Sequence, residues 1–284
     1  MLSYRHSFHA GNFADLLKHL VLVYLVDYLN KKDKPYACLD THSGAGLYTL
    51  HGNEAQKTGE YQQGIARLIE ATHIEHPLLQ RFRTLVQEFN PAHELSHYPG
   101  SPAWLQKLTR AQDRLLFNEL HPQDWQQLTQ LMQDDPRVHI EKQDAYARLK
   151  ASLPFPERRG LILIDPSYEI KDEYQQVVQA IAQAYRRMAT GVFALWYPVI
   201  QRQQVEQLCR DLKATGIARL LRIEHCISAD TSGFGMTGSG MLVINPPYTL
   251  AKDFTLLLPE LNQLLAQDAS AHFTVEWLRG EAEG

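Results

Sequence analysis

The stretch "LILIDPSYE", residues 161–169, is the most apolar part of a regular pattern that runs through the chain. Its branched apolar residues, Leu161 to Ile164, predict a strand buried on both faces of a sheet. An acid, Asp165, follows at once, and the theme returns as "MLVINPPYT" at residues 241–249. Each stretch ends in an acid or amide, a proline and an aromatic residue. The direction of each strand in the sheet therefore decides which of the two can meet a ligand.

Strand and helix patterns alternate on both sides of this stretch. A helix is predicted at residues 12–29 before the first strand. Further strands are predicted at residues 35–40, 114–120, 137–145, 191–198, 218–227 and 240–247, and helices at residues 121–132, 146–153, 173–189 and 202–216. Such alternation predicts an α/β fold, a Rossmann-like parallel sheet with helices on both faces.

The region between the first two strands departs from that rhythm. Residues 60–72 and 76–89 both show helical periodicity where a short connection is expected. We therefore predict a helical subdomain at residues 50–98, inserted into a Rossmann-like domain made of residues 1–49 and 99–284.

Composition narrows the possible partners and locations. The formal net charge of -4 gives no overall positive field, so binding to a nucleic acid needs a local basic patch. Cys38, Cys209 and Cys226 form no C-x-x-C pair, and His73 and His76 lack a well-placed third ligand. No apolar run approaches the ~20 residues that span a bilayer. We expect a cytoplasmic protein without a membrane segment or a metal.

Acids recur at the predicted strand ends. Asp40 opens the glycine turn "DTHSGAG" at residues 40–46, and Glu119, Asp144 and Asp165 end the next strands. Glycines let the backbone approach a ligand closely. Because parallel strands bring their carboxyl ends to one edge, these acids are predicted to surround a ligand crevice. Glu119 could accept hydrogen bonds from ribose hydroxyls, and Asp144 could accept one from an adenine amine. A nicotinamide dehydrogenase could use the first acids, but it would not explain the box at residues 165–168.

That box suits the methylation of an amine. The exocyclic amine of a base is a poor nucleophile because its lone pair is delocalised into the ring. Asp165 and the Pro166 carbonyl can accept hydrogen bonds from both amino hydrogens in a fixed geometry. Tyr168 can stack on a base that has been turned out of its helix into a pocket.

Strand direction favours the first box over the second. The strand that ends at Asn245 follows its neighbour after a short glycine loop, so the two are predicted to be antiparallel. Asn245 then lies at the edge opposite the crevice and serves as a structural strand exit. The loop Gly233 to Gly240 is predicted to face the crevice and to contact substrate.

The chain closely resembles the ribosomal RNA large-subunit methyltransferase J family over nearly its whole length. The likeness is carried by "MLSYRHSFHAGNFADLLKH", "LDTHSGAG", "TGEYQQGIAR", "YPGSP", "NELHP", "RRGLILIDPSYE" and "GMTGSGMLVINPP". The resemblance implies an S-adenosylmethionine-dependent enzyme that methylates N6 of an adenine in 23S ribosomal RNA. It also implies a Rossmann-like fold with a helical insertion and large-subunit ribosomal RNA as the partner. We expect a monomer.

The family's functional positions can be matched one by one. Positions expected to contact the cofactor are His19, His42, Gly44, Ser101, Glu119, Asp144, Ala145 and Asp165. Positions expected to act in catalysis are Asp165, Pro166 and Tyr168. At the amino terminus, Tyr4 is expected to stack on RNA, with Arg5 or Lys18 near a phosphate.

One departure from the family pattern leaves alternatives open. Ser167 stands where the family's box has a second proline, which frees φ and restores an N–H. We expect a less rigid acceptor loop with activity retained. The alternatives are a methyltransferase that acts on DNA adenine or another amine, such as cytosine N4 or glutamine, and a catalytically weakened nucleic-acid-binding protein linked to the use of external DNA.

Overall fold

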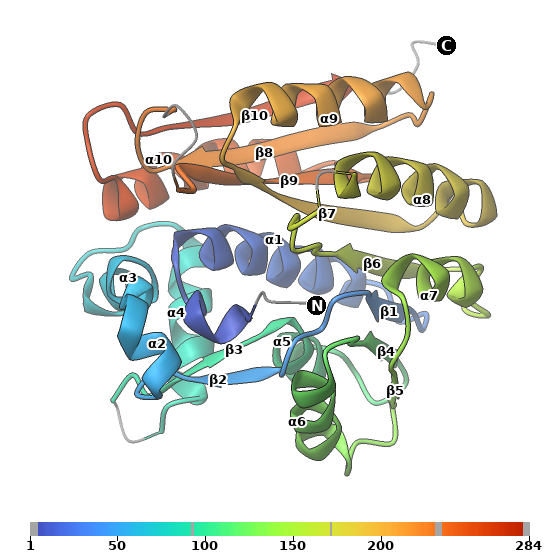
Figure 1. Ribbon diagram of the computed structural model, residues 1–284, viewed down its shortest axis with the longest axis horizontal. Coiled ribbons are helices and arrows are strands. Elements are labelled where there is room, and N and C mark those ends of the chain that lie inside the picture. The colour runs from blue at the N-terminus through green and yellow to red at the C-terminus, as the bar shows by residue number, and fades with distance from the viewer. Residues whose placement is uncertain (1–4, 92–93, 171, 231–234, 281–284) are drawn as a thin grey trace.

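The central element of the computed structural model is an eight-stranded sheet in the order β10-β8-β9-β7-β6-β1-β4-β5 (Figure 1). The structure describes residues 5–91, 94–170, 172–230 and 235–280. The strands of this sheet are β1 Ala37–Asp40, β4 Arg114–Asn118, β5 Val138–Glu141, β6 Gly160–Ile164, β7 Val192–Val199, β8 Leu220–Cys226, β9 Gly238–Ile244 and β10 His272–Arg279. β5, β4, β1, β6 and β7 run parallel, whereas β9 lies antiparallel between β7 and β8. The predicted α/β fold is confirmed.

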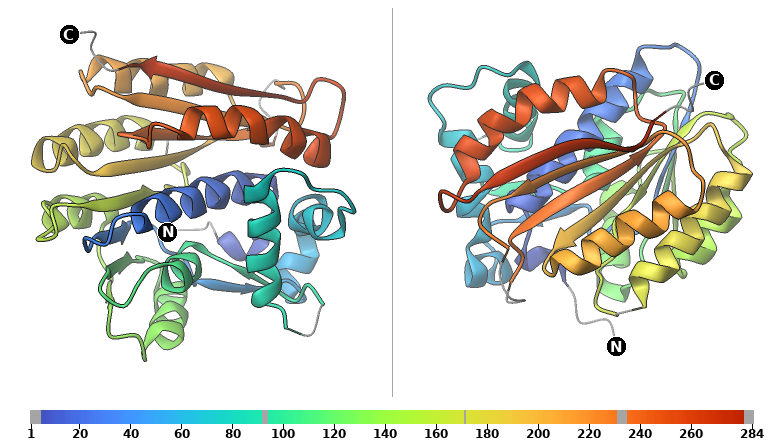
Figure 2. Two further views of the ribbon diagram at one scale, coloured as in Figure 1. Left: turned by 180° about the vertical axis from the view of Figure 1, so that it is seen from behind. Right: turned by 90° about the horizontal axis from the view of Figure 1, so that it is seen from above.

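Helices cover both faces of the sheet (Figure 2). The helices are α1 Phe13–Asn30, α5 Ser101–Leu108, α6 Pro122–Met132, α7 Ala145–Ser152, α8 Glu173–Arg187, α9 Arg202–Ala214 and α10 Leu250–Leu265. One apolar core joins the sheet to α1, α5, α6 and α10, and a second joins it to α7, α8 and α9. No helix among the described residues is long and apolar enough to cross a membrane.

The first helix is more deeply buried than an amphipathic surface helix. α1 begins after Asn12, whose side chain accepts hydrogen bonds from the backbone N–H groups of Ala14 and Asp15. Its apolar residues are buried around almost the whole helix, because α1 contacts the sheet as well as α5 and α4 (Pro77–Glu88). Polar side chains of α1 that face the sheet edge are therefore held inside the protein.

The segment between β1 and β4 is mainly helical, as its periodicity predicts. It contains β2 Leu47–Thr49, α2 Asn53–Thr58, a 3₁₀ turn η2 Glu60–Gln63, α3 Ile65–Glu70, α4 Pro77–Glu88 and β3 His97–Pro99. The predicted helix at residues 60–72 is broken at Gly64, where an added Cβ would lie 2.1 Å from the Gly11 carbonyl oxygen. Apolar side chains of α3 and α4 share one core with α1. A separate subdomain at residues 50–98 therefore stays a prediction.

The carboxyl-terminal part of the sheet corrects one expectation. The strand that ends at Asn245 is not the last, because α10 and the antiparallel edge strand β10 follow it. The residues of β10, "HFTVEWLR", alternate polar and apolar as a partly buried edge strand does, but they form no continuous apolar run like those that mark the other strands.

The predicted positions of the two boxes at opposite edges are confirmed. β9 runs antiparallel to β7, and the Asn245 side chain donates to the carbonyls of Ala189 and Gly191, just before β7 begins. Part of the predicted glycine loop, Gly238 to Gly240, belongs to β9 itself, and residues 233–234 lie outside the described residues. A role for this loop in substrate contact stays a prediction.

Candidate active site

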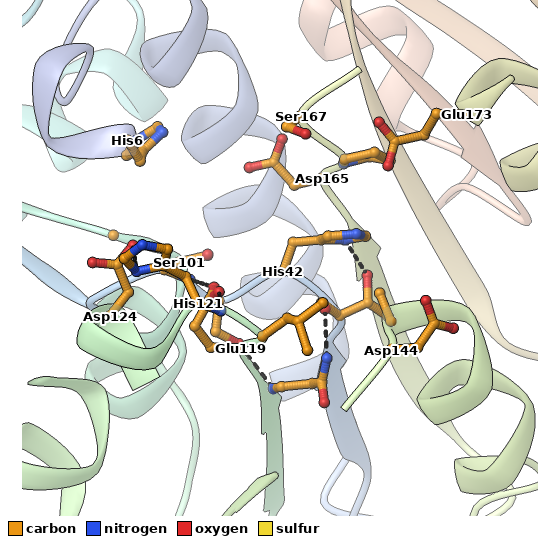
Figure 3. Close-up of a pocket in the computed structure, with 18 of the residues that line it drawn as sticks. His6, His42, Ser101, Glu119, His121, Asp124, Asp144, Asp165, Ser167 and Glu173 are labelled. Atoms are coloured by element: carbon orange, nitrogen blue, oxygen red, sulfur yellow. Dashed lines mark hydrogen bonds and ion pairs between the residues drawn. The ribbon is translucent and has the colours of Figure 1, made fainter. Parts of the chain in front are cut away.

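A cavity of about 250 Å³ opens where the carboxyl ends of β1, β4, β5 and β6 meet (Figure 3). Asp165 and Ser167 lie on one side of it, and Glu119 and Ser101 on the other. The predicted site residues that line it are Lys18, His19, His42, Gly44, Ser101, Glu119, Asp144, Ala145, Asp165 and Pro166. Glu119, Asp144 and Asp165 therefore converge on one crevice, whereas Asp40 is fully buried and is not among the residues that line it.

Two glycines shape the turn after β1. Gly44 has φ +61°, and a Cβ there would lie 2.1 Å from the Tyr48 hydroxyl oxygen. Gly46 has φ +83°, and a Cβ there would lie 2.9 Å from a side-chain carbon of Leu131. Side chains are excluded at both positions by conformation and by space. The turn consequently presents its backbone to the cavity.

Glu119 is held by that turn. Its two oxygens accept hydrogen bonds from the backbone N–H groups of Gly44 and His121, each at 2.7 Å. Burial raises the pKa of this carboxyl above its ordinary value. Each carboxylate oxygen can accept a second hydrogen bond, so Glu119 can still receive two ribose hydroxyls from the cavity. Asp144 caps α7 by accepting from the Ala147 N–H at 2.8 Å.

Several buried polar atoms in and near the cavity have no hydrogen-bond partner among the described residues, and two of them belong to His19 and Asp40. His19 lies fully buried, and its Nδ1 lies 2.8 Å from the Tyr98 hydroxyl, while its Nε2 is unpartnered. Burial holds the pKa of His19 well below its usual range, so the ring is neutral. Asp40 is also fully buried, with Oδ2 unpartnered, and burial raises its pKa to about 7. Such orphaned groups fit a polar ligand.

His42 completes this side of the cavity. Its Nδ1 lies 2.8 Å from the Thr41 hydroxyl, and its ring meets that of Tyr146 edge-on at 6.0 Å between centroids. Burial lowers the pKa of His42 to about 4, which leaves the ring uncharged near neutral pH. The wall therefore combines a neutral imidazole with backbone donors and carboxylate acceptors.

Lys18 lies in the site, not on the surface where the predicted phosphate contact would place it. Its Nζ donates to Asp165 Oδ2 at 2.7 Å and to Asp15 Oδ1 at 2.8 Å, and the residue is 4% exposed. Burial alone would lower the pKa of Lys18, but the two carboxylates raise it above its usual range. Because both partners lie inside the protein, we interpret Lys18 as a partner of Asp165. The other amino-terminal residues lie elsewhere: Arg5 pairs with Glu54 outside the cavity, and Tyr4 lies outside the described residues.

Tyr168 does not line the cavity in this structure. Its φ is +54°, and its hydroxyl donates to the Trp196 carbonyl at 2.7 Å. Its ring packs on Tyr174 at 4.4 Å between centroids, and its backbone N–H bonds to the Glu173 carboxylate. Stacking of this ring on a base would therefore require it to leave these contacts.

The sequence motifs assign no individual role to several residues that line the cavity. They are His6, Tyr48, Leu120, His121, Asp124, Ile170 and Glu173. Leu120 and Ile170, which directly follow Glu119 and the box, are 44% and 60% exposed. Exposed apolar side chains beside a cavity are a feature of ligand sites, and their places next to predicted site residues are the only hint.

A cluster of possible metal ligands lies outside the cavity. Oxygen, sulfur and nitrogen ligand atoms of Glu224, Cys226 and His272 lie within 4.8 Å of one another. Arg202 donates to Glu224 at 2.6 Å and to Cys226 at 3.3 Å. Burial raises the pKa of the Cys226 thiol to about 12. The Arg202 guanidinium already bonds to two of these three possible ligands, so the cluster does not fit a metal ion.

The fold and the site together define the class of protein. A mostly parallel Rossmann-like sheet carries antiparallel strands β9, β8 and β10 beyond β7, with a glycine turn after β1 and carboxylates at successive strand ends, which makes this an α/β protein with a ligand crevice at the carboxyl edge of its sheet. The chain belongs to the RlmJ family, whose model, "Ribosomal RNA large subunit methyltransferase D, RlmJ", matches residues 33–279.

Individual relatives agree with this assignment. The chain is 49% identical to ribosomal RNA large subunit methyltransferase J of Escherichia coli, covering 98% of this chain and 99% of that protein. It is 46% identical to the protein of the same name from Haemophilus influenzae, covering 99% and 100%. A crystal structure of protein LPL1258 from Legionella pneumophila superposes with a TM-score of 0.89 at 38% identity, covering 96% and 99%.

The protein is therefore a methyltransferase, and S-adenosylmethionine is its methyl donor. The residues present fit this cofactor. Glu119 offers acceptors for ribose hydroxyls, and the unpartnered Nε2 of His19, which lines the cavity, suits a polar group of the cofactor.

Proposed function

We propose that the protein transfers a methyl group from S-adenosylmethionine to N6 of an adenine in large-subunit ribosomal RNA. One observation carries the chemistry: Asp165 and Pro166 line the cavity, and neither Asp165 Oδ1 nor the Pro166 carbonyl has a hydrogen-bond partner among the described residues. These are the two acceptors that an exocyclic amine needs. The names of the two bacterial relatives support ribosomal RNA as the substrate. Such a substrate agrees with a cytoplasmic location.

The cofactor supplies an electrophilic methyl group on a positively charged sulfur. We propose that Glu119 binds its ribose and Asp144, with the backbone of Ala145, its adenine. Ser101, His42 and the Gly44 backbone line the space between them. The carboxylates give the crevice a negative potential that suits the cationic cofactor.

Asp165 and Pro166 act on the target amine. Hydrogen bonds from N6 to the Asp165 carboxylate and the Pro166 carbonyl favour a pyramidal nitrogen with its lone pair directed at the methyl group. The ion pair with Lys18 fixes the orientation of the carboxylate before the substrate arrives. Acceptors that are already in place stabilise the charge developing on nitrogen without a cost of reorganisation. The rate advantage follows from that positioning.

The base must leave its stack to reach this cavity. We propose that Tyr168 stacks on the adenine after its ring leaves Tyr174 and the Trp196 carbonyl. The overall charge of -4 favours recognition of a compact RNA element over contact with a long duplex.

The test uses labelled S-adenosylmethionine with three acceptors in parallel: unmodified large-subunit RNA, duplex DNA and a protein extract. We expect label in RNA, recovered as N6-methyladenosine, and its loss in Asp165→Ala. Label in DNA or protein would contradict the proposed substrate. Cofactor binding without transfer to any acceptor would support the alternative of a nucleic-acid-binding protein.

A further inference from the structure

Asp15 is a buried carboxylate that does not line the cavity but touches the residues that do. It is 2% exposed and lies in the first turn of α1. Its Oδ1 accepts from Lys18 Nζ at 2.8 Å. Its Oδ2 lies 2.9 Å from both the Gly11 backbone N and His6 Nε2. The Asp15 carboxylate thus links Gly11 and His6, which precede α1, to Lys18, the ion-pair partner of Asp165.

The ammonium of Lys18 is divided almost equally between two carboxylates. It lies 2.8 Å from Asp15 Oδ1 and 2.7 Å from Asp165 Oδ2, with the Trp196 ring centroid 5.9 Å away. Solvent screens charges weakly at such depth. If Asp165 were the only carboxylate near Lys18, the attraction of the ammonium would act on Asp165 alone. Because Asp15 also attracts the ammonium, Lys18 is held between two negative charges.

We propose that Asp15 is a positioning residue for methyl transfer: by sharing Lys18, it holds the ammonium in place and keeps Asp165 a strong acceptor for the target amine. The inference rests on the proposed function, since it concerns the acceptor strength of Asp165. Asp15 does not line the cavity, and its proposed effect on Asp165 passes through Lys18.

The charge on Asp15 agrees with this role. Burial alone would raise the pKa of Asp15, but the neighbouring charges of His6 and Lys18 hold it well below its usual range. The carboxylate therefore remains ionised at every pH at which the protein would be assayed. A bond to the Gly11 N–H alone, as in ordinary helix capping, would need an acceptor but not a charge.

Asp15→Asn separates these two roles because the amide oxygen can still accept from Gly11 while the charge is gone. The measurement is the single-turnover rate of methylation of large-subunit RNA at saturating S-adenosylmethionine. We expect the rate to fall by about tenfold or more, with no change in the dissociation constant of S-adenosylhomocysteine, because Asp15 is not part of the cavity wall. Asp15→Glu, which restores the charge, should recover much of the rate.

Asp27→Asn is the matched control. It removes a carboxylate from the same helix, where Asp27 pairs with Arg81 at 2.7 Å near the surface, far from the site along α1. We expect the wild-type rate. Thermal unfolding of each variant, with rates expressed per folded protein, separates a loss of stability from a loss of rate.

A double-mutant cycle tests whether Asp15 acts through Lys18. In a Lys18→Met background, Asp15→Asn should slow methylation no further. Additive losses, a wild-type rate in Asp15→Asn, or an Asp15→Glu variant as slow as Asp15→Asn would each overturn the inference. If the wild-type protein places no label in RNA, the proposed function fails and the inference fails with it.

Discussion

The segments that directly follow β6 and β9 share a pattern of residues but lie in different environments. At the first, Asp165 bonds to a buried lysine and faces a cavity. At the second, Asn245 adopts φ +53° and bonds to the carbonyls of Ala189 and Gly191, while Tyr248 is 77% exposed. The better copy of the motif is the structural one. The comparison teaches that a short motif acquires chemistry only from the edge of the sheet at which its strand ends.

The largest expected effect separates the two boxes by activity. Asp165→Asn keeps the shape but removes the charge that Lys18 needs, so we expect methylation of RNA to fall by about a thousandfold. Tyr248→Ala, at the exposed end of the second box, should leave the rate unchanged. Single-turnover assays of both variants make the comparison. A substantial loss of methylation rate in Tyr248→Ala would contradict the functional distinction between the two edges of the sheet.

Near the crevice, burial of the charged Asp40 carboxylate should lower the free energy of unfolding. Because the pKa of Asp40 is raised from 3.8 to about 7, the folded protein holds a proton there that the unfolded chain releases. The stability contribution is present at low pH and is lost as pH rises towards about 7. Asp40→Asn should therefore raise the free energy of unfolding by up to about 4 kcal/mol at pH 8.

Denaturant unfolding of wild type and Asp40→Asn at pH 4 and pH 8 measures this difference. The gain from the substitution should shrink towards zero at pH 4, where both states of the wild-type protein carry more of the proton. A gain independent of pH would show that burial of the charge is not its source.

At the opposite edge, substitution should affect stability alone. Asn245→Ala removes two hydrogen bonds, one exposed and one partly buried, and places alanine at positive φ, so we expect a loss of about 2 kcal/mol in the free energy of unfolding. Asn245→Gly tolerates the backbone conformation, so it isolates the contribution of the hydrogen bonds. Both variants should methylate RNA at the wild-type rate per folded protein. Slower transfer would mean that the second box communicates with the site.

The smallest effect concerns the residue at which the first box is imperfect. Ser167 lines the cavity, and its N–H has no acceptor among the described residues, so proline would remove no hydrogen bond. Ser167→Pro should stiffen the acceptor loop and raise the single-turnover rate by about two- to threefold. Ser167→Ala, which keeps the backbone freedom, is the control. An unchanged rate with proline would contradict the argument from rigidity.

Much of the fold was accessible from the sequence. Apolar runs separated by helical periodicity located the parallel strands, and chain order with a short glycine loop set the direction of β9. The edge strand β10 escaped because its residues are only partly buried, which leaves no apolar run to recognise. Strand-end acids could be placed at one edge because parallel strands share their carboxyl ends.

What the sequence determined is therefore local and periodic: the strands, the glycine turn and the order of the acids along the crevice. The tertiary structure alone decided how side chains distant in the chain meet. Lys18 and Asp165 are 147 positions apart, and nothing in either segment indicates that α1 carries its lysine to the end of β6. The direction of the Tyr168 ring was likewise open, because a residue at positive φ is aimed by the packing around it. Backbone patterns follow from short-range sterics and apolar spacing, whereas such encounters depend on how whole elements pack.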